Sequence, residues 1–401
     1  MKRFTSLAVT TASIFTFATS CSDNKTSSSD GDSSTTTEVV DPTAGPEDDA
    51  FYTPPSPLPD GAAGDLIWKT EISSDATSTL YKVLYLSTNV ADEPVAVSGL
   101  VWVPANVSAD APLLSYAHGT TGLGDDCAPS KDAGKEEASL FAAPFVAQGF
   151  IVAATDYEGS GTPGVHPYVV GLSEARGTLD IIRTARAMTE SSGKAIVWGH
   201  SQGGGAALIT AEFAPTYAPD TNVVGAVAGA PAVELKLLAA VLRTSPYFGY
   251  VFMAGAGFQA AYPSIDLSQV LTPEGLAMVK TASETCGEIH DMVRGKDPTL
   301  YISKDPASVE PFASYLEENT PGNKATSIPI FVYHGESDEQ IPVLGSKLYL
   351  DRACNTGGYT LLRKTYPNMG HVQVIEAAKN DILSWIDARL AGTPAETTPC
   401  A

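Results

Sequence analysis

The sequence predicts an α/β protein in which helices flank a mostly parallel central sheet. Three observations support this fold class. Strand-like and helix-like runs alternate from about residue 64, several strand-like runs are apolar throughout, and one long interval contains no strong strand-like run. Continuous apolar runs are expected of strands buried on both faces of a parallel sheet. Alternation with helices favours right-handed crossovers between such strands.

Eight segments carry the strand pattern, at residues 80–86, 95–103, 112–117, 150–155, 194–199, 223–228, 328–333 and 359–365. Four helical segments lie among them, at residues 136–148, 173–191, 203–213 and 372–390. Within the second of these, Ala175, Leu179 and Ile182 recur at helical spacing and form one apolar stripe.

The alternation stops between residues 232 and 326, where no strong strand pattern occurs and pieces such as 233–242 and 273–281 favour helices. We therefore expect a helical cap over 232–326, inserted into a core built from residues 64–231 and 327–401. The aromatic segment 247–258 has two open interpretations: its side chains line an acyl-binding cleft, or they form the cap's own core.

The pentapeptide Gly199-His200-Ser201-Gln202-Gly203 has the Gly-x-Ser-x-Gly form of a nucleophile elbow. An apolar run precedes it, and a run of small, helix-compatible residues follows it, which is the context that the motif requires. We expect Ser201 to be a nucleophile and the backbone N–H of Gln202 to face a developing oxyanion. The alternative is a glycine-rich turn whose serine has no role.

A serine hydroxyl is a weak nucleophile and needs a base, and the base needs an orienting acid. On this fold the chain order is serine, acid, histidine. Asp338 follows the expected strand at 328–333 and is the predicted acid, because acidic side chains of such sites lie beyond a strand's carboxyl end. Glu336 and Glu339 are the alternatives.

The predicted base is His371, which alone among the later histidines lies between an expected strand and an expected helix. His290 lies in the expected cap, and His334 precedes the acid at the end of a strand. The spacing between Ser201 and Asp338 is long enough to hold an inserted cap.

The second oxyanion donor is expected in the loop after an earlier strand, where residues 118–122 are His-Gly-Thr-Thr-Gly. We assign it to the backbone N–H of Thr120, with Thr121 as the alternative. His118 is expected to support this loop rather than to transfer a proton. The loop at 156–164 rims the same face and is assigned no chemistry.

Residues 1–20 are predicted to be an export signal, with a basic start at Lys2 and Arg3 and an apolar stretch too short to span a bilayer. Small residues before Cys21 resemble a bacterial lipobox, so we expect lipidation of Cys21. Ala18 stands where leucine is usual, which leaves ordinary signal-peptidase cleavage open. Residues 21–63 are expected to be a flexible tether, because Ser, Thr, Asp and Gly dominate its first part.

The other four cysteines have no close spacing of the kind found in zinc or redox sites. An even number in an exported chain suggests two disulfides, for which three pairings are possible. We favour Cys354–Cys400, which would hold the C-terminal tail, and Cys127–Cys286, which would tie the cap to the active-site rim.

The chain of 401 residues has a formal net charge of −22, which argues against a nucleic-acid partner. It contains no His-Glu-x-x-His set, no phosphate-binding glycine loop and no dinucleotide fingerprint, so no metal and no cofactor are expected. We expect a monomer that meets a membrane only through the lipid anchor at Cys21.

The chain resembles the secretory lipase family, in particular its bacterial relatives of the cap-bearing lipase A type. The resemblance extends from about residue 64 to the C-terminus and rests on motifs at 116–122, 127–130, 156–159, 199–204 and 225–231. It implies an α/β-hydrolase core with a mainly helical lid, a Ser201–Asp338–His371 triad and both favoured disulfides. It also implies hydrolysis of carboxylic esters, often of long-chain acylglycerols. The His-Gly-Thr-Thr-Gly loop departs from the acidic sequence of the yeast branch, which weakens any transfer of chain-length preference.

The predicted function is therefore an exported serine ester hydrolase, at the cell envelope or secreted, that cleaves acylglycerols through an acyl-enzyme. The alternatives within enzymes are a short-chain carboxylesterase, an acyltransferase and a peptidase. A non-catalytic surface binding protein on the same fold is the alternative from another class.

Overall fold

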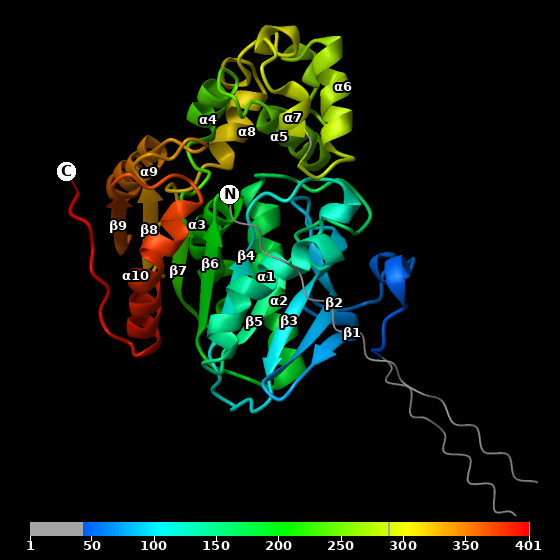
Figure 1. Ribbon diagram of the computed structural model, residues 1–401, viewed down its shortest axis with the longest axis vertical. Helices are drawn as coiled ribbons and strands as arrows, with labels where there is room; N and C mark the ends of the chain where they lie inside the picture. The colour runs from blue at the N-terminus through cyan, green and yellow to red at the C-terminus, as the bar shows by residue number, and fades with distance from the viewer. Residues whose placement is uncertain (1–42, 288, 401) are drawn as a thin grey trace, which may run out of the picture. The chain divides into compact units, whose positions relative to one another are not determined.

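The computed structural model describes residues 43–287 and 289–400 (Figure 1). For residues 132–137 and 140 it describes the backbone alone. The predicted export signal, Cys21 and residues 21–42 of the predicted tether lie outside the described residues. Within the described ranges, no helix is both long and apolar enough to cross a membrane.

The central sheet has nine strands in the order β1-β2-β3-β5-β4-β6-β7-β8-β9. Strand β1 pairs antiparallel with β2, β2 with β3, and β3 with β5. The remaining neighbours, from β5 through β4 and β6 to β9, pair in parallel. This confirms the predicted α/β-hydrolase class with a mostly parallel sheet. The strand bounds are β1 Leu66–Ser74, β2 Ser78–Thr88, β3 Pro94–Pro104, β4 Leu113–Ala117, β5 Ile151–Thr155, β6 Ala195–His200, β7 Val223–Gly229, β8 Ile330–Gly335 and β9 Leu361–Tyr366.

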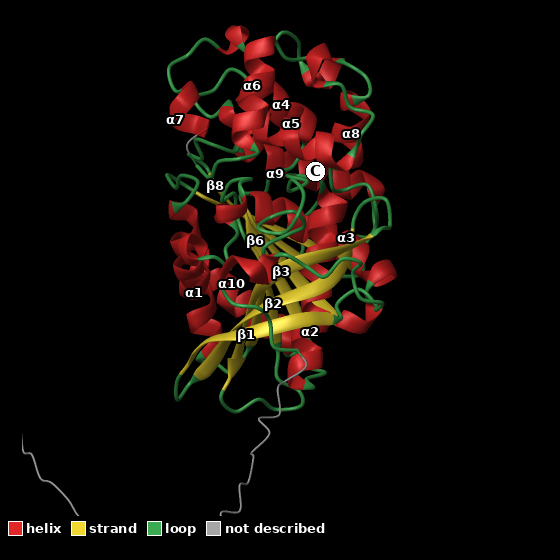
Figure 2. Ribbon diagram, turned by 90° about the vertical axis from the view of Figure 1, so that its right-hand side faces the viewer, coloured by secondary structure: helices red, strands yellow, loops and turns green. Residues whose placement is uncertain are grey.

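Helices cover both faces of the sheet. In Figure 2, α1 and α10 lie on one side of the strands and α2 and α3 on the other. In β6 the side chains alternate accordingly: Ala195 and Val197 pack with α2, α3 and α9, whereas Ile196 and Trp198 pack with α1 and α10. The helix bounds are α1 Asp132–Val146, α2 Gly171–Thr189, α3 Gln202–Tyr217, α9 Val343–Thr356 and α10 Gln373–Leu390.

Five further helices lie between β7 and β8, within the interval predicted to form the cap, and gather beyond one end of the sheet (Figure 1). They share a hydrophobic cluster that also takes in Leu123, Tyr168 and Val170 from core loops. Their bounds are α4 Leu235–Leu242, α5 Gly249–Ala261, α6 Pro273–Ala282, α7 Ile289–Val293 and α8 Phe312–Glu318.

Two disulfides are present, with the pairing that we favoured. Cys127 joins Cys286 with a Cα–Cα distance of 5.3 Å, and this bond links the loop before α1 to the cap. Cys354 of α9 joins Cys400 near the C-terminus with a Cα–Cα distance of 5.7 Å.

One short segment within the expected tether, Asp48–Tyr52, packs against the sheet. A 3₁₀ helix, Asp48–Tyr52, buries the side chains of Phe51 and Tyr52 against Leu84 and Ala96 of the sheet. Tyr52 Oη also lies 2.9 Å from Ser130 Oγ. Burial of these two adjacent aromatic side chains holds the segment against the sheet.

Candidate active site

Ser201 lies at the sharp turn between β6 and α3, with φ 60° and ψ −120°. A backbone in this left-handed region is strained for a residue with a side chain. The neighbouring glycines explain why the turn can form. A Cβ atom at Gly199 would lie 2.1 Å from Gly203 O, and one at Gly203 would lie 1.9 Å from Ala117 O.

The carboxyl ends of β8 and β9 bring Asp338 and His371 together. His371 Nδ1 lies 2.7 Å from Asp338 Oδ2, and Asp338 Oδ1 accepts hydrogen bonds from the N–H groups of Gln340 and Ile341 at 2.9 and 2.8 Å. Burial alone would raise the pKa of Asp338, but hydrogen bonds from His334 and His371 outweigh it and hold that pKa below its usual range. The carboxylate is therefore ionised at neutral pH.

The two alternative acids contact other groups. Glu336 accepts a hydrogen bond from Thr365 Oγ1 at 2.7 Å. Glu339 accepts one from the backbone N–H of His371 at 3.1 Å, so it contacts the base's main chain rather than its ring. Among the three acidic residues of this loop, Asp338 is the one within hydrogen-bond distance of the imidazole.

The ring of His371 lies beside that of His200, the residue before the serine, with centroids 4.8 Å apart. Burial and the neighbouring His371 lower the pKa of His200 to about 3, so the His200 ring is neutral at physiological pH. Within the described ranges no hydrogen bond joins Ser201 Oγ to the His371 ring. Such contacts often tighten only when substrate binds.

The predicted oxyanion loop lies against the elbow. A Cβ atom at Gly119 would be 3.8 Å from Ser201 Cβ. Thr120 Oγ1 lies 2.7 Å from Tyr168 Oη, which holds this loop to the segment before α2. Gln202 is the first residue of α3, so its N–H is among the donors that lack an intrahelical partner.

His118 supports this loop. Its Nδ1 lies 2.6 Å from Gly119 O, and its backbone carbonyl accepts a hydrogen bond from Tyr157 Oη at 3.1 Å. Burial lowers the pKa of His118 to about 4, so its ring is neutral in the pH range where a hydrolase of this kind would work.

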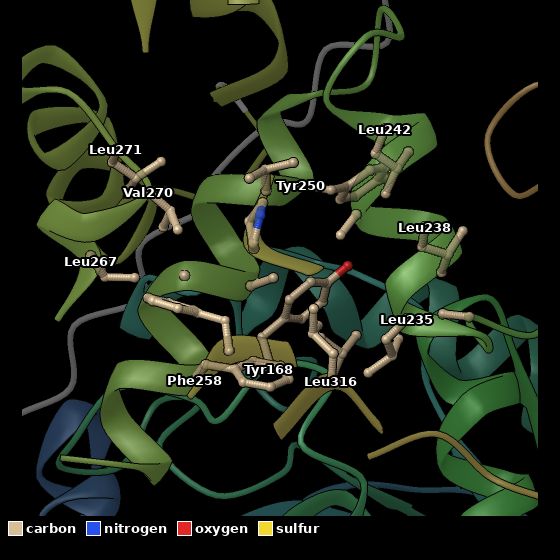
Figure 3. Close-up of a pocket in the computed structure, with 18 of the residues that line it drawn as sticks. Tyr168, Leu235, Leu238, Leu242, Tyr250, Phe258, Leu267, Val270, Leu271 and Leu316 are labelled. Atoms are coloured by element: carbon tan, nitrogen blue, oxygen red, sulfur yellow. The ribbon is translucent and has the colours of Figure 1, made fainter. Parts of the chain in front are cut away.

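An apolar cavity of about 100 Å³ reaches from Ser201 into the group of helices between β7 and β8. Figure 3 shows leucine side chains of α4 and of the segment around 267–271 on opposite sides of it. Tyr250, Ala254 and Phe258 of α5, each four residues apart, line the cavity, while Phe252 packs in the cap's own core. The aromatic segment therefore both lines a cavity and packs within the cluster of helices α4 to α8.

The model of the secretory lipase family matches residues 135–398, well over half of the chain. This chain belongs to the secretory lipase family. Lipase A of Moesziomyces aphidis is 25% identical over 365 residues, which cover 80% of this chain and 76% of that relative. The secreted triacylglycerol lipase LIP4 of Malassezia globosa is 27% identical over 385 residues, covering 88% and 83% of the two chains.

Candida antarctica lipase A in its closed state has the same fold, with a TM-score of 0.76 at 22% identity and coverage of 88% of this chain and 89% of that chain. A relative in Mycobacterium tuberculosis, 24% identical over 374 residues that cover 87% of this chain and 83% of the relative, is named a probable inactive lipase. Membership of the family therefore leaves turnover to be argued from the site itself.

The site also has a buried polar group that sequence reasoning missed. Gln202 Nε2 lies 2.8 Å from both His166 Nε2 and Glu174 Oε1, beneath the elbow. Burial lowers the pKa of His166 to about 3 and raises the pKa of Glu174 to about 7. The available signal was a glutamate directly before Ala175 of the apolar stripe, since a carboxyl that is buried at such a position requires a polar partner.

Proposed function

We propose that this protein is an exported serine hydrolase that cleaves carboxylic esters of apolar acyl chains, acylglycerols among them. The observation that carries the proposal is the apolar cavity that starts at Ser201, beside a histidine already paired with a buried carboxylate. An acyl chain gains about 0.8 kcal/mol for each methylene that it buries, so a cavity of this composition favours substrates with a hydrocarbon arm.

In the proposed reaction, Ser201 Oγ attacks the ester carbonyl while His371 Nε2 accepts the hydroxyl proton. Asp338 holds the imidazole by its Nδ1–H and stabilises the imidazolium that forms. The backbone N–H groups of Gln202 and Thr120 stabilise the tetrahedral oxyanion. Collapse breaks the bond to the alcohol, which takes the proton from His371 and leaves an acyl-enzyme. Water, activated by the same histidine, then releases the acid and frees Ser201.

Export fits the two disulfides, which persist in oxidising compartments. Family membership and the secreted relative support the same location. We retain as proposals the export signal at 1–20, a lipid anchor at Cys21, the cap at 232–326 and a monomeric state.

The proposal is tested by hydrolysis of p-nitrophenyl esters from two to eighteen carbons, with Ser201→Ala as the control. We expect turnover that favours longer chains and disappears in the variant, whose melting temperature stays at the wild-type value. Turnover confined to the shortest esters would make the protein a short-chain esterase. Activity near the wild-type level in the variant would refute the assignment of Ser201.

A second candidate is a surface protein that binds apolar ligands in this cavity without turnover, as the inactive relative suggests. It predicts saturable binding of fatty acid, no hydrolysis of any ester, and no reaction with a fluorophosphonate probe. Covalent labelling by the probe would exclude it, because only an activated serine displaces the fluoride.

A further inference from the structure

His334 is the penultimate residue of β8 and has a fully buried side chain, four residues before Asp338. Its Nε2 lies 3.2 Å from Asp338 Oδ2 and 3.0 Å from the carbonyl oxygen of Ile341. Both neighbours are acceptors, so Nε2 must carry a proton and donate. Its Nδ1 is buried and has no hydrogen-bond partner among the described residues.

The oxygen that His334 contacts is the one that holds His371. Asp338 Oδ2 therefore meets two imidazole N–H groups, at 2.7 Å from His371 and 3.2 Å from His334, while Oδ1 accepts two backbone N–H groups. Three of these groups are hydrogen-bonded to the carboxylate, and His334 shares its N–H between Oδ2 and the carbonyl oxygen of Ile341. The negative charge available to His371 is shared with a second, permanent donor.

We propose that His334 is a positioning residue that acts through Asp338. It fixes the rotamer of the carboxylate and limits how strongly Asp338 attracts the His371 imidazolium. The inference rests on the proposed function, because it concerns the same reaction. His334 also holds the acid loop closed through Ile341, whose side chain lines the apolar cavity. One buried ring thus links the orientation of the base to the wall of the substrate site.

The other titratable groups around this pair contact different atoms. His200 Nδ1 lies 3.2 Å from Tyr333 Oη, and Glu339 accepts the backbone N–H of His371. Tyr250 of the cap donates to Gln340 Oε1 at 2.9 Å rather than to the carboxylate. Among the side chains in the described ranges, His371 is hydrogen-bonded to Asp338, and His334 Nε2 lies 3.2 Å from the same oxygen while its N–H is shared with the carbonyl oxygen of Ile341.

The test compares His334→Met with His334→Gln, two side chains of almost the same length and shape. A glutamine amide can donate from about the position of Nε2, whereas methionine cannot donate at all. We expect His334→Met to lower kcat roughly 10-fold with KM within a factor of two, since one hydrogen bond to a charged group is lost. The acid limb of the kcat/KM profile should move to higher pH, because an unshared carboxylate holds the imidazolium more strongly. His334→Gln should restore both quantities.

Equal losses in the two variants, with unchanged pH profiles, would overturn the proposal and leave His334 a packing residue. Melting temperatures show whether each variant is folded. If His334→Met does not fold, His334→Asn replaces it, because the asparagine amide is too short to reach Oδ2. We expect the asparagine variant to match the losses predicted for methionine.

A second readout separates this inference from the proposed function. The Nδ1 proton of His371 should give a low-field ¹H NMR signal in the resting protein, whether or not any ester is turned over. We expect the signal to move further downfield in His334→Met, since Asp338 then accepts from one imidazole only, and to return in His334→Gln. An unchanged signal would overturn the role of His334. Absence of ester turnover in the wild type would instead refute the proposed function alone.

Discussion

The substitution Asp338→Asn removes one acceptor oxygen from a carboxylate that four N–H groups approach. An asparagine offers one carbonyl oxygen and an amide NH₂. If the carbonyl faces the backbone N–H groups of Gln340 and Ile341, the NH₂ faces the imidazoles. His371 must then accept at Nδ1, and its proton moves to Nε2, the nitrogen that should receive the Ser201 proton. The reverse orientation places the NH₂ against two backbone donors, which cannot change tautomer, so the first orientation is favoured.

A base in the wrong tautomer costs about 10⁴-fold in kcat, which corresponds to about 5 kcal/mol of transition-state stabilisation. The variant should also be less stable at neutral pH. The pKa of Asp338 lies below its usual range in the folded protein, so the ionised carboxylate contributes stability above the ordinary pKa of an aspartate. That contribution is lost as the pH falls through the lowered pKa. The difference in melting temperature between the wild type and Asp338→Asn should therefore become smaller in acid.

The assay is the initial rate of p-nitrophenyl ester hydrolysis together with thermal unfolding at pH 7 and pH 2.5, which lie on either side of the ordinary pKa of an aspartate. The matched control is Glu336→Gln, which alters an acidic residue of the same loop that contacts Thr365 instead of the imidazole. We expect the control to retain activity within about twofold. A kcat for Asp338→Asn within tenfold of the wild type would refute the tautomer reasoning.

Three further predictions concern the cavity, a disulfide and a buried acid. Ala254→Phe should fill the cavity of about 100 Å³ and shift the ester preference to shorter acyl chains. The expected loss is a factor of about four in kcat/KM for each methylene that the cavity excludes. An unchanged chain-length preference would contradict an acyl site there. Joint replacement of Cys354 and Cys400 by serine opens a loop with a sequence separation of 46 residues. This double substitution should lower the free energy of unfolding in urea by about 4 kcal/mol without changing kcat. An unchanged urea midpoint would contradict the prediction. Burial raises the pKa of Glu212 to about 7, so the wild-type free energy of unfolding should fall as the pH rises from the ordinary pKa of a glutamate to this value. Glu212→Gln should make that fall smaller, while other buried carboxyls such as Glu174 keep the rest of it; parallel curves for both proteins would disprove the prediction.

The elbow and the acid–base pair were predictable because local constraints determine them. Gly199 and Gly203 are required wherever a serine turns this sharply, and acids and bases of such sites follow the ends of parallel strands. The strand runs around them were apolar enough to locate from the sequence. Asp338 and His371 accordingly lie 2.7 Å apart in the structure, although 32 residues separate them in the chain.

The missed elements have weaker local patterns. Strand β1 is an edge strand whose residues are half-buried or exposed, and its centre, Lys69-Thr70-Glu71, is polar. Helix α9 buries small residues such as Gly345 and Ser346, which give little apolar periodicity. The packing of Phe51 depends on a surface formed by strands that come later in the chain, so composition alone indicated a tether there.

The supporting residues of the site could not be assigned because their partners are distant in sequence. His334 was considered as a base and set aside, but nothing local indicated that its ring contacts the acid itself. Gln202 contacts His166 and Glu174, which are 36 and 28 residues away. Such contacts arise only once helix α2 and the preceding loop have packed beneath the elbow.

The central claim is that Ser201 is a nucleophile activated by His371 beneath an apolar cavity. The most direct measurement is the intact mass and peptide map of the full chain after reaction with a long-chain alkyl fluorophosphonate. We expect one adduct per chain, on the peptide that contains Ser201. The adduct should form at least 10³-fold more slowly in His371→Ala and should be absent in Ser201→Ala. No adduct in the wild type, or an adduct that persists in Ser201→Ala, would contradict it.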